Sequence, residues 1–78
     1  MPIKIKYFGA IAEQTGQTEE HISADDFGSL EELKSHLLSK YQSIGQHSFQ
    51  MAVNQALTES ANLQDGDEVA LLPPFAGG

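Results

Sequence analysis

The C-terminal residues 71–78 read LLPPFAGG, and the last of them, Gly78, brings a carboxylate with no neighbouring side chain. A carboxylate is a poor electrophile, but its transfer to AMP produces an acyl adenylate whose carbonyl carbon a nucleophile can attack. Gly77 and Gly78 have no Cβ, so the end of the chain can enter a channel too narrow for other residues. We therefore predict that Gly78 is the reactive residue and that this protein is the substrate of an activating enzyme.

The rest of the sequence lacks the residues needed to carry out that activation itself. It has no cysteine, no glycine-rich phosphate-binding motif and no paired general acid and base. Asp65, Asp67 and Glu68 do not match a calcium-binding loop, and Asp-Gly-Asp is common turn chemistry. The three histidines fall on separate predicted elements without ligand spacing. We expect no metal site and no cofactor bound by this chain.

Two prolines, an aromatic residue and an alanine precede the terminal glycines. Pro73 and Pro74 have no N–H to donate, so they end strand pairing and give the tail, residues 73–78, an extended path away from the sheet. Phe75 and Ala76 offer a small apolar anchor to a partner. A terminal Gly-Gly pair alone also fits a frayed end, whereas the full run PPFAGG directly after an apolar strand is more specific.

Composition limits the classes of protein that this chain can represent. Its 78 residues, 40% of them hydrophobic, suit one small domain over residues 1–78. A net charge of −7 would repel nucleic-acid phosphates and anionic lipids, and suits either solubility or docking on a basic protein surface. The N-terminus enters an alternating Ile-Lys pattern without an apolar export or membrane segment. We expect a cytoplasmic protein with no nucleic acid and no membrane among its partners.

Three short elements are predicted before the main helix. Residues 3–7 (IKIKY) alternate apolar with polar side chains, which predicts a strand with one buried face, and Phe8 then falls on the opposite face. Residues 9–15 can form a helical turn that ends at Gly16, since glycine accepts a positive φ. Residues 17–23 are mostly polar, as in an exposed edge strand.

The best-defined element is a helix that follows Gly28. Ser29 and Glu32 fit a capping box, in which two side chains satisfy backbone N–H groups and together contribute about 1 kcal/mol. Five apolar residues at helical spacing form one stripe: Leu30, Leu33, Leu37, Leu38 and Tyr41. Since this stripe is the helix's part of the core, truncating Leu33 or Leu37 to alanine should cost about 2–5 kcal/mol.

The C-terminal half is predicted to contain a loop at 45–48, a strand at 49–53, a turn at 54–55 and a short strand starting at Leu57. An Asp-Gly turn then precedes the strand 69–72, which is apolar on both faces and should be central. One helix can cover only one face of a sheet, so either a long loop or another protein covers the other. In so small a domain we favour a partner protein. Its candidate contact residues are Phe8, Leu57, Leu72 and Phe75.

Four stretches of the sequence resemble the ubiquitin-like sulfur carriers, and among them most closely the small subunits of molybdopterin synthase. They are residues 5–8, the turn at 53–55, the run LQDGDEVA at 63–70 and the terminal PPFAGG. The last two together are specific, and the likeness extends over essentially the whole chain. It implies the β-grasp fold, an α+β, ubiquitin-like fold with a mixed sheet of four to five strands crossed by one main helix. In that fold the first and last strands lie parallel at the centre.

The same resemblance implies what the tail does. An activating enzyme that uses ATP and magnesium adenylates the terminal glycine, here Gly78, which is then converted to a thiocarboxylate. The tail enters the large subunit of molybdopterin synthase, which is expected to hold the catalytic residues, and donates sulfur to the pyranopterin precursor. The chain departs from the family pattern at Phe75, where an aliphatic residue is expected, and at Leu71 and Leu72, where aromatic residues are common. These departures bear on which large subunit the carrier fits.

Three alternatives to this function stay open. The thiamine-pathway carriers share the fold and the Gly-Gly end, but they usually lack the Pro-Pro step. A ubiquitin-like protein modifier, joined through its C-terminus to lysines of other proteins, also fits the tail. A plain β-grasp interaction module would have no use for Gly78 as a reactive end.

Overall fold

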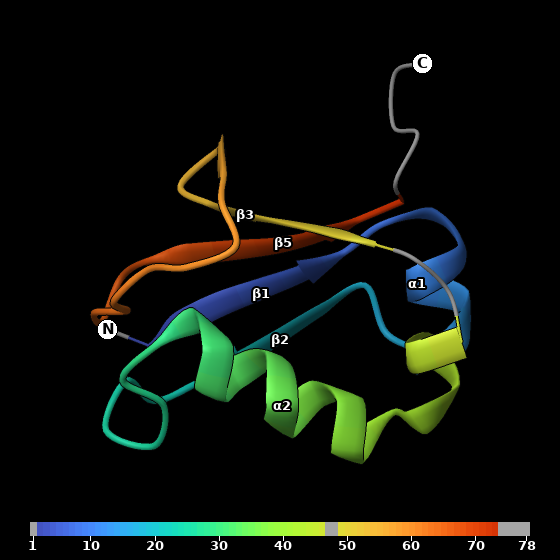
Figure 1. Ribbon diagram of the computed structural model, residues 1–78, viewed down its shortest axis with the longest axis horizontal. Helices are drawn as coiled ribbons and strands as arrows, with labels where there is room; N and C mark the ends of the chain where they lie inside the picture. Colours follow the sequence, from blue (N-terminus) through green and yellow to red (C-terminus); the bar gives the residue numbers. More distant parts are fainter. Residues whose placement is uncertain (1, 47–48, 74–78) are drawn as a thin grey trace.

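A mixed five-stranded sheet crossed by one long helix forms the framework of the protein, as a computed structural model shows (Figure 1). The structure describes residues 2–46 and 49–73. In chain order the elements are β1 (Ile3–Tyr7), α1 (Gly9–Thr15), β2 (Glu19–Ile22), α2 (Leu30–Lys40), the 3₁₀ helix η1 (Gln42–Gln46), β3 (Gln50–Val53), β4 (Ala56–Leu57) and β5 (Glu68–Leu72).

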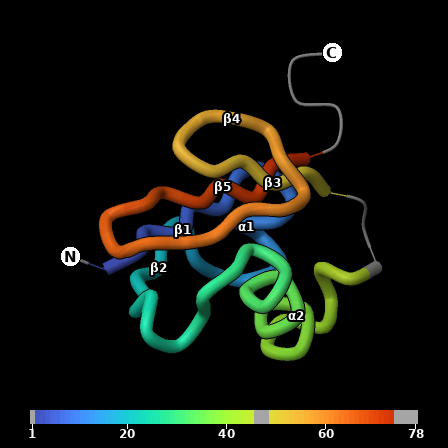
Figure 2. Tube along the Cα trace, turned by 60° about the vertical axis from the view of Figure 1, so that its left-hand side comes forward, coloured from blue at the N-terminus to red at the C-terminus, as the bar shows by residue number. Residues whose placement is uncertain are grey.

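The sheet has the order β2-β1-β5-β3-β4, which places the first and last strands side by side near its centre. β1 and β5 run parallel, with Ile5 opposite Val69, and β3 pairs antiparallel with the other side of β5. The short strands β2 and β4 form the two edges. Figures 1 and 2 show α2 along one side of this sheet. The predicted β-grasp fold, with parallel central strands and one crossing helix, is confirmed.

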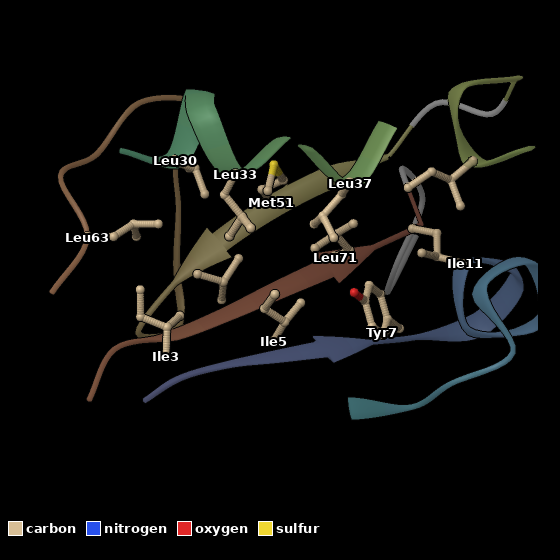
Figure 3. Packing of buried hydrophobic residues seen from close by; sticks show 12 residues of the cluster. Ile3, Ile5, Tyr7, Ile11, Leu30, Leu33, Leu37, Met51, Leu63 and Leu71 are labelled. Atoms are coloured by element: carbon tan, nitrogen blue, oxygen red, sulfur yellow. The ribbon is translucent and has the colours of Figure 1, made fainter. Parts of the chain in front are cut away.

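The core lies between α2 and the face of the sheet that it covers (Figure 3). Alternate residues of β1 point toward the helix, as its period-2 pattern predicted. In β5, Val69 and Leu71 point toward the helix in the same way. The helix begins after Ser29, whose Oγ accepts a hydrogen bond from the Glu32 N–H at 3.2 Å. The main core residues are Ile3, Ile5, Tyr7, Ile11, Leu30, Leu33, Leu37, Ile44, Met51, Leu63, Val69 and Leu71.

The segment after α2 differs from the prediction. A loop was predicted at 45–48, but the chain forms the 3₁₀ helix η1 as far as Gln46, and residues 47–48 lie outside the described part. Ile44 explains the difference, because its side chain is completely buried in the core and keeps this segment in contact with α1 and α2. The edge strand β2 is also shorter than predicted, since it spans Glu19–Ile22 instead of residues 17–23.

Two of the stretches that carried the family resemblance meet at the turn between β3 and β4. Asn54 and Gln55 have φ values of 51° and 72°, the left-handed conformation that a two-residue hairpin turn requires. The Asn54 amide Nδ2 donates to Asp67 Oδ1 at 3.1 Å, and its Oδ1 accepts from the Glu68 N–H at 3.0 Å. This bridge fixes the hairpin to the start of β5.

Candidate functional site

The structure describes the root of the tail but not Gly78, the residue predicted to be reactive. β5 ends at Leu72, and Pro73 is the last described residue. The predicted residues Pro74, Phe75, Ala76, Gly77 and Gly78 lie outside the described part of the chain. The tail therefore starts from the end of a central strand that is hydrogen-bonded on both sides.

The loop between β1 and α1 packs against this root. The Phe8 N–H donates to the Leu71 carbonyl at 3.2 Å, which holds the loop beside the end of β5 (Figure 1). Gly9 follows with a φ of +58°, and a Cβ built on it would lie only 2.9 Å from Cγ of Pro73. Sequence reasoning treated Gly9 only as the start of a helical turn. A glycine two residues after the end of the first strand was the available signal for a close approach.

Three of the four predicted partner-contact residues lie together on the face of the sheet opposite α2. Phe8, Leu57 and Leu72 all border one shallow hollow of about 430 Å³. Phe8 and Leu57 are 43% and 65% exposed, and Leu72 is half-buried. We call this surface the open-face hollow; its other bordering residues are Lys6, Gln50, Ala52, Gln55, Glu68 and Ala70.

Strand register places Leu57 of the edge strand β4 in line with residues of the three neighbouring strands. Lys6 is paired with Ala70, Ala70 with Ala52, and Ala52 with Leu57, so one row crosses four strands. Paired residues point to the same face of a sheet. The two small alanines in the middle of the row leave the hollow between the larger side chains at its borders.

The open-face hollow carries little charge. Among its bordering residues only Lys6 and Glu68 have charged side chains, and they form an ion pair with Nζ 3.4 Å from Oε1. Removing this pair from water costs desolvation free energy, which the attraction between the two charges offsets only in part. The other bordering residues are uncharged, so another protein can cover most of this surface without burying a charge.

A polar cluster on the opposite, core side of the sheet joins the edge strand β2 to the end of α2. Glu20 lies opposite Ile5 in the ladder, so its side chain points to the core side. Its Oε1 accepts hydrogen bonds from the hydroxyls of Tyr7 and Tyr41, both at 2.6 Å, and its Oε2 accepts from Lys40 Nζ at 2.9 Å. The two tyrosine rings also meet edge to face, with centroids 6.1 Å apart.

Burial and hydrogen bonding shift the pKa values of the tyrosines and of the glutamate in this cluster in opposite directions. Burial, followed by the hydrogen bond to Glu20, raises the pKa of Tyr7 far above its ordinary value and also raises that of Tyr41. Burial alone would raise the pKa of Glu20, but the hydrogen bonds from Tyr41, Tyr7 and Lys40 outweigh it and hold that pKa below its ordinary value. A carboxylate that stays ionised beside hydroxyls that stay protonated suits a structural anchor rather than proton transfer. Sequence reasoning missed this cluster because its members are far apart in the chain.

Within the described part of the chain, the histidines and the acidic turn are not brought together in one place. His21 lies 3.2 Å from a Glu19 oxygen, and His36 packs against the Phe27 ring at 4.6 Å, while residue 47 is outside the described part. Within residues 2–46 and 49–73, no three histidine, aspartate or glutamate side chains are placed to share a metal ion. In the same part of the chain, no helix is both long and apolar enough to cross a bilayer.

The acidic turn uses its carboxylates to hold the backbone. Asp65 Oδ1 accepts from the Ala24 N–H at 3.1 Å, and Asp67 Oδ2 accepts from the Gln64 N–H at 2.9 Å. The geometry of the turn is enough to explain the first part of the run LQDGDEVA, without a bound ligand.

Comparison with known proteins shows to which family the chain is similar. The ThiS family matches residues 5–78. A Mycobacterium tuberculosis protein named "Molybdopterin synthase sulfur carrier subunit" is 38% identical over 80 aligned positions. The match covers 97% of this chain and 96% of that protein. A solved Helicobacter pylori structure, a "Protein-protein complex of subunit 1 and 2 of Molybdopterin-converting factor", is 28% identical with a TM-score of 0.72, over the full length of both chains.

A third similarity concerns the fold alone. The solution structure of small archaeal modifier protein 1 from Methanosarcina acetivorans has a TM-score of 0.79 at 21% identity, covering 99% of this chain and 96% of that one. The family match extends from the first strand through the terminal Gly-Gly, and the full-length relative exceeds 30% identity. The chain therefore belongs to the ThiS family.

Proposed function

We propose that this chain is the sulfur carrier subunit of a molybdopterin synthase, and that Gly78 carries the sulfur. The observation that carries the proposal is the position of Leu72, which borders the open-face hollow and directly precedes the tail root Pro73. The root of the tail thus lies at the edge of the open-face hollow. The name of the Mycobacterium tuberculosis relative and the terminal PPFAGG support the same function.

The chemistry requires that Gly78 is the C-terminal residue of the working protein. Its carboxylate attacks the α-phosphorus of ATP on a magnesium-dependent activating enzyme, and pyrophosphate leaves. Hydrosulfide, or a protein persulfide whose S–S bond a thiol then reduces, attacks the acyl carbon and releases AMP. The product is a thiocarboxylate. In the synthase its sulfur bonds to a carbon of the pyranopterin precursor, and an oxygen substituent leaves that carbon. Water then cleaves the acyl–sulfur bond, so that the sulfur stays on the pterin and the carboxylate is restored.

The residues of this chain bind and position the sulfur; the catalytic residues belong to the partners. We assign docking on the large subunit of the synthase to the open-face hollow, with Phe8, Leu57 and Leu72 as its apolar contacts and Phe75 as a further contact in the tail. Gly77 and Gly78 pass through the narrow part of the partner's channel, since they have no side chains. ATP and magnesium belong to the activating enzyme in the cytoplasm, and this chain needs no bound cofactor.

The test is the intact mass of the protein after incubation with ATP, magnesium, the activating enzyme of the same organism and a sulfur donor. Exchange of one oxygen for sulfur at Gly78, followed by loss of that sulfur to the pterin precursor when the large subunit is added, supports the proposal. A variant with one residue added after Gly78 is the control and should stay unmodified while folding normally. Sulfur transfer by that extended variant would refute the assignment.

Two other outcomes would replace the proposal. Conjugation of the tail to lysines of other proteins would identify a modifier, the function named for the Methanosarcina acetivorans neighbour. Sulfur that is consumed only by a thiazole-forming enzyme would assign the chain to the thiamine pathway.

A further inference from the structure

Gly9 is the described glycine at which an added side chain would collide with the tail root. A Cβ at this position would lie 2.9 Å from Cγ and 3.8 Å from Cδ of Pro73. Separations below 3.0 Å essentially do not occur for real Cβ atoms. The pyrrolidine ring ties Cγ to the backbone, so Pro73 cannot rotate this atom away as a flexible side chain could.

Two other glycines with a positive φ show that backbone conformation alone does not explain this contact. Gly16 and Gly66 have φ values of +74° and +92°, and a Cβ on either would have no neighbour within 4 Å. An alanine at any of the three positions would be strained by the left-handed backbone. Only at Gly9 would it also displace the start of the tail.

We propose that Gly9 is a positioning residue that sets the direction in which the tail leaves the sheet. Pro73 has no N–H and cannot extend the ladder beyond Leu72. At this point the packing of its ring on Gly9, instead of strand pairing, orients the chain. The loop that holds Gly9 is itself fixed, because the Phe8 N–H binds the Leu71 carbonyl and Tyr7 is paired with Leu71. This inference rests on the proposed function, in which the tail must enter a partner's channel in one direction.

A spin-label experiment tests the direction of the tail without any sulfur chemistry. The chain has no cysteine, so an Ala76→Cys variant carries a nitroxide at a single site, and the label broadens the amide signals of the residues near it. Adding Gly9→Ala should change which amides are broadened, whereas adding Gly16→Ala should reproduce the pattern of the parent. An unchanged pattern with Gly9→Ala, or the same change with Gly16→Ala, would overturn the proposal.

A single-turnover assay links this direction to function. Carrier prepared chemically as the thiocarboxylate is mixed with the large subunit and the pterin precursor, at a temperature at which every variant is folded. Gly9→Ala should slow sulfur transfer roughly 10-fold or more, since small displacements of a reacting group are costly, while Kd for the large subunit changes less than about 3-fold. Gly16→Ala should stay within about 2-fold of the wild-type rate.

Removing the Pro73 ring tests whether Gly9→Ala acts through its contact with that ring. In a Pro73→Ala background the Gly9→Ala substitution should have little additional effect on the transfer rate, because the atom it displaces is gone. Equal losses in both backgrounds would show that Gly9→Ala acts only through backbone strain, and would overturn the proposal. If the wild type transfers no sulfur but the label pattern still shifts with Gly9→Ala alone, the positioning role stands and the proposed function fails.

Discussion

Leu57 gives the most direct test of the open-face hollow, because most of its surface is free to be buried by a partner. It lies on the two-residue edge strand β4 and is 65% exposed, whereas Leu33 in α2 is completely buried. Full burial of a leucine side chain contributes about 1.5–3 kcal/mol. The exposed two thirds of Leu57 would therefore contribute about 1–2 kcal/mol when the large subunit covers it.

Leu57→Ala should accordingly raise Kd for the large subunit about 5- to 30-fold. The free energy of unfolding should fall by less than about 1 kcal/mol, since only a third of the side chain is buried in the free protein. Leu33→Ala is the matched control with the same change of side chain. It should lower the free energy of unfolding by about 2–5 kcal/mol and leave Kd unchanged wherever the variant is folded.

Isothermal titration calorimetry measures Kd for each variant, and urea denaturation measures its stability. The open-face assignment requires the two variants to separate, with Leu57→Ala affecting binding and Leu33→Ala affecting folding. If Leu57→Ala leaves Kd unchanged with a fully folded carrier, the large subunit docks elsewhere and our reasoning from exposure is wrong.

Two further changes test how the framework holds the site. Glu20→Gln should lower the free energy of unfolding by about 1–3 kcal/mol at neutral pH, because the amide NH2 cannot accept from Lys40 and the negative charge that strengthens all three hydrogen bonds is lost. The pKa of Glu20 lies below its ordinary value, so this loss should be complete above about pH 5 and should vanish as the pH falls through the lowered pKa; a pH-independent difference in urea titrations would contradict it. Asn54→Ala should be about 1–2 kcal/mol less stable than Asn54→Gly, since both variants lose the side-chain hydrogen bonds but only glycine accepts the φ of 51° freely. Equal denaturation midpoints for these two variants would refute the strain at that turn.

Sequence reasoning correctly predicted the features that depend on local patterns of residues. The start of α2 follows from Ser29, whose side chain binds a backbone group three residues away. The inward face of β1 follows from its strict alternation, and the same parity correctly placed Phe8 on the other side of the sheet. In each case the deciding contacts join neighbours in the chain or repeat with the period of one element.

The features that sequence reasoning missed depend on contacts between distant residues. Ile44 stands alone in a polar segment, so no periodicity marked it, although its burial determines the 3₁₀ helix η1. Glu20 read as one more exposed charge on an edge strand until the fold brought two tyrosines and a lysine to it. The approach of Gly9 to Pro73 joins opposite ends of the chain, and only the parallel pairing of β1 with β5 creates it.

The central strand β5 combines three roles that constrain it strongly. Val69 and Leu71 are completely buried against α2, Ala70 and Leu72 face the open-face hollow, and the tail follows directly at Pro73. A substitution in β5 therefore affects a residue of the core, a residue of the proposed docking surface or the residue next to the tail root. The edge residue Leu57 has only one of these roles, because it lies on a two-residue strand and is largely exposed. Partner specificity can thus change at the β4 edge without disturbing the strand that positions the tail, which is where we expect carriers for different large subunits to differ.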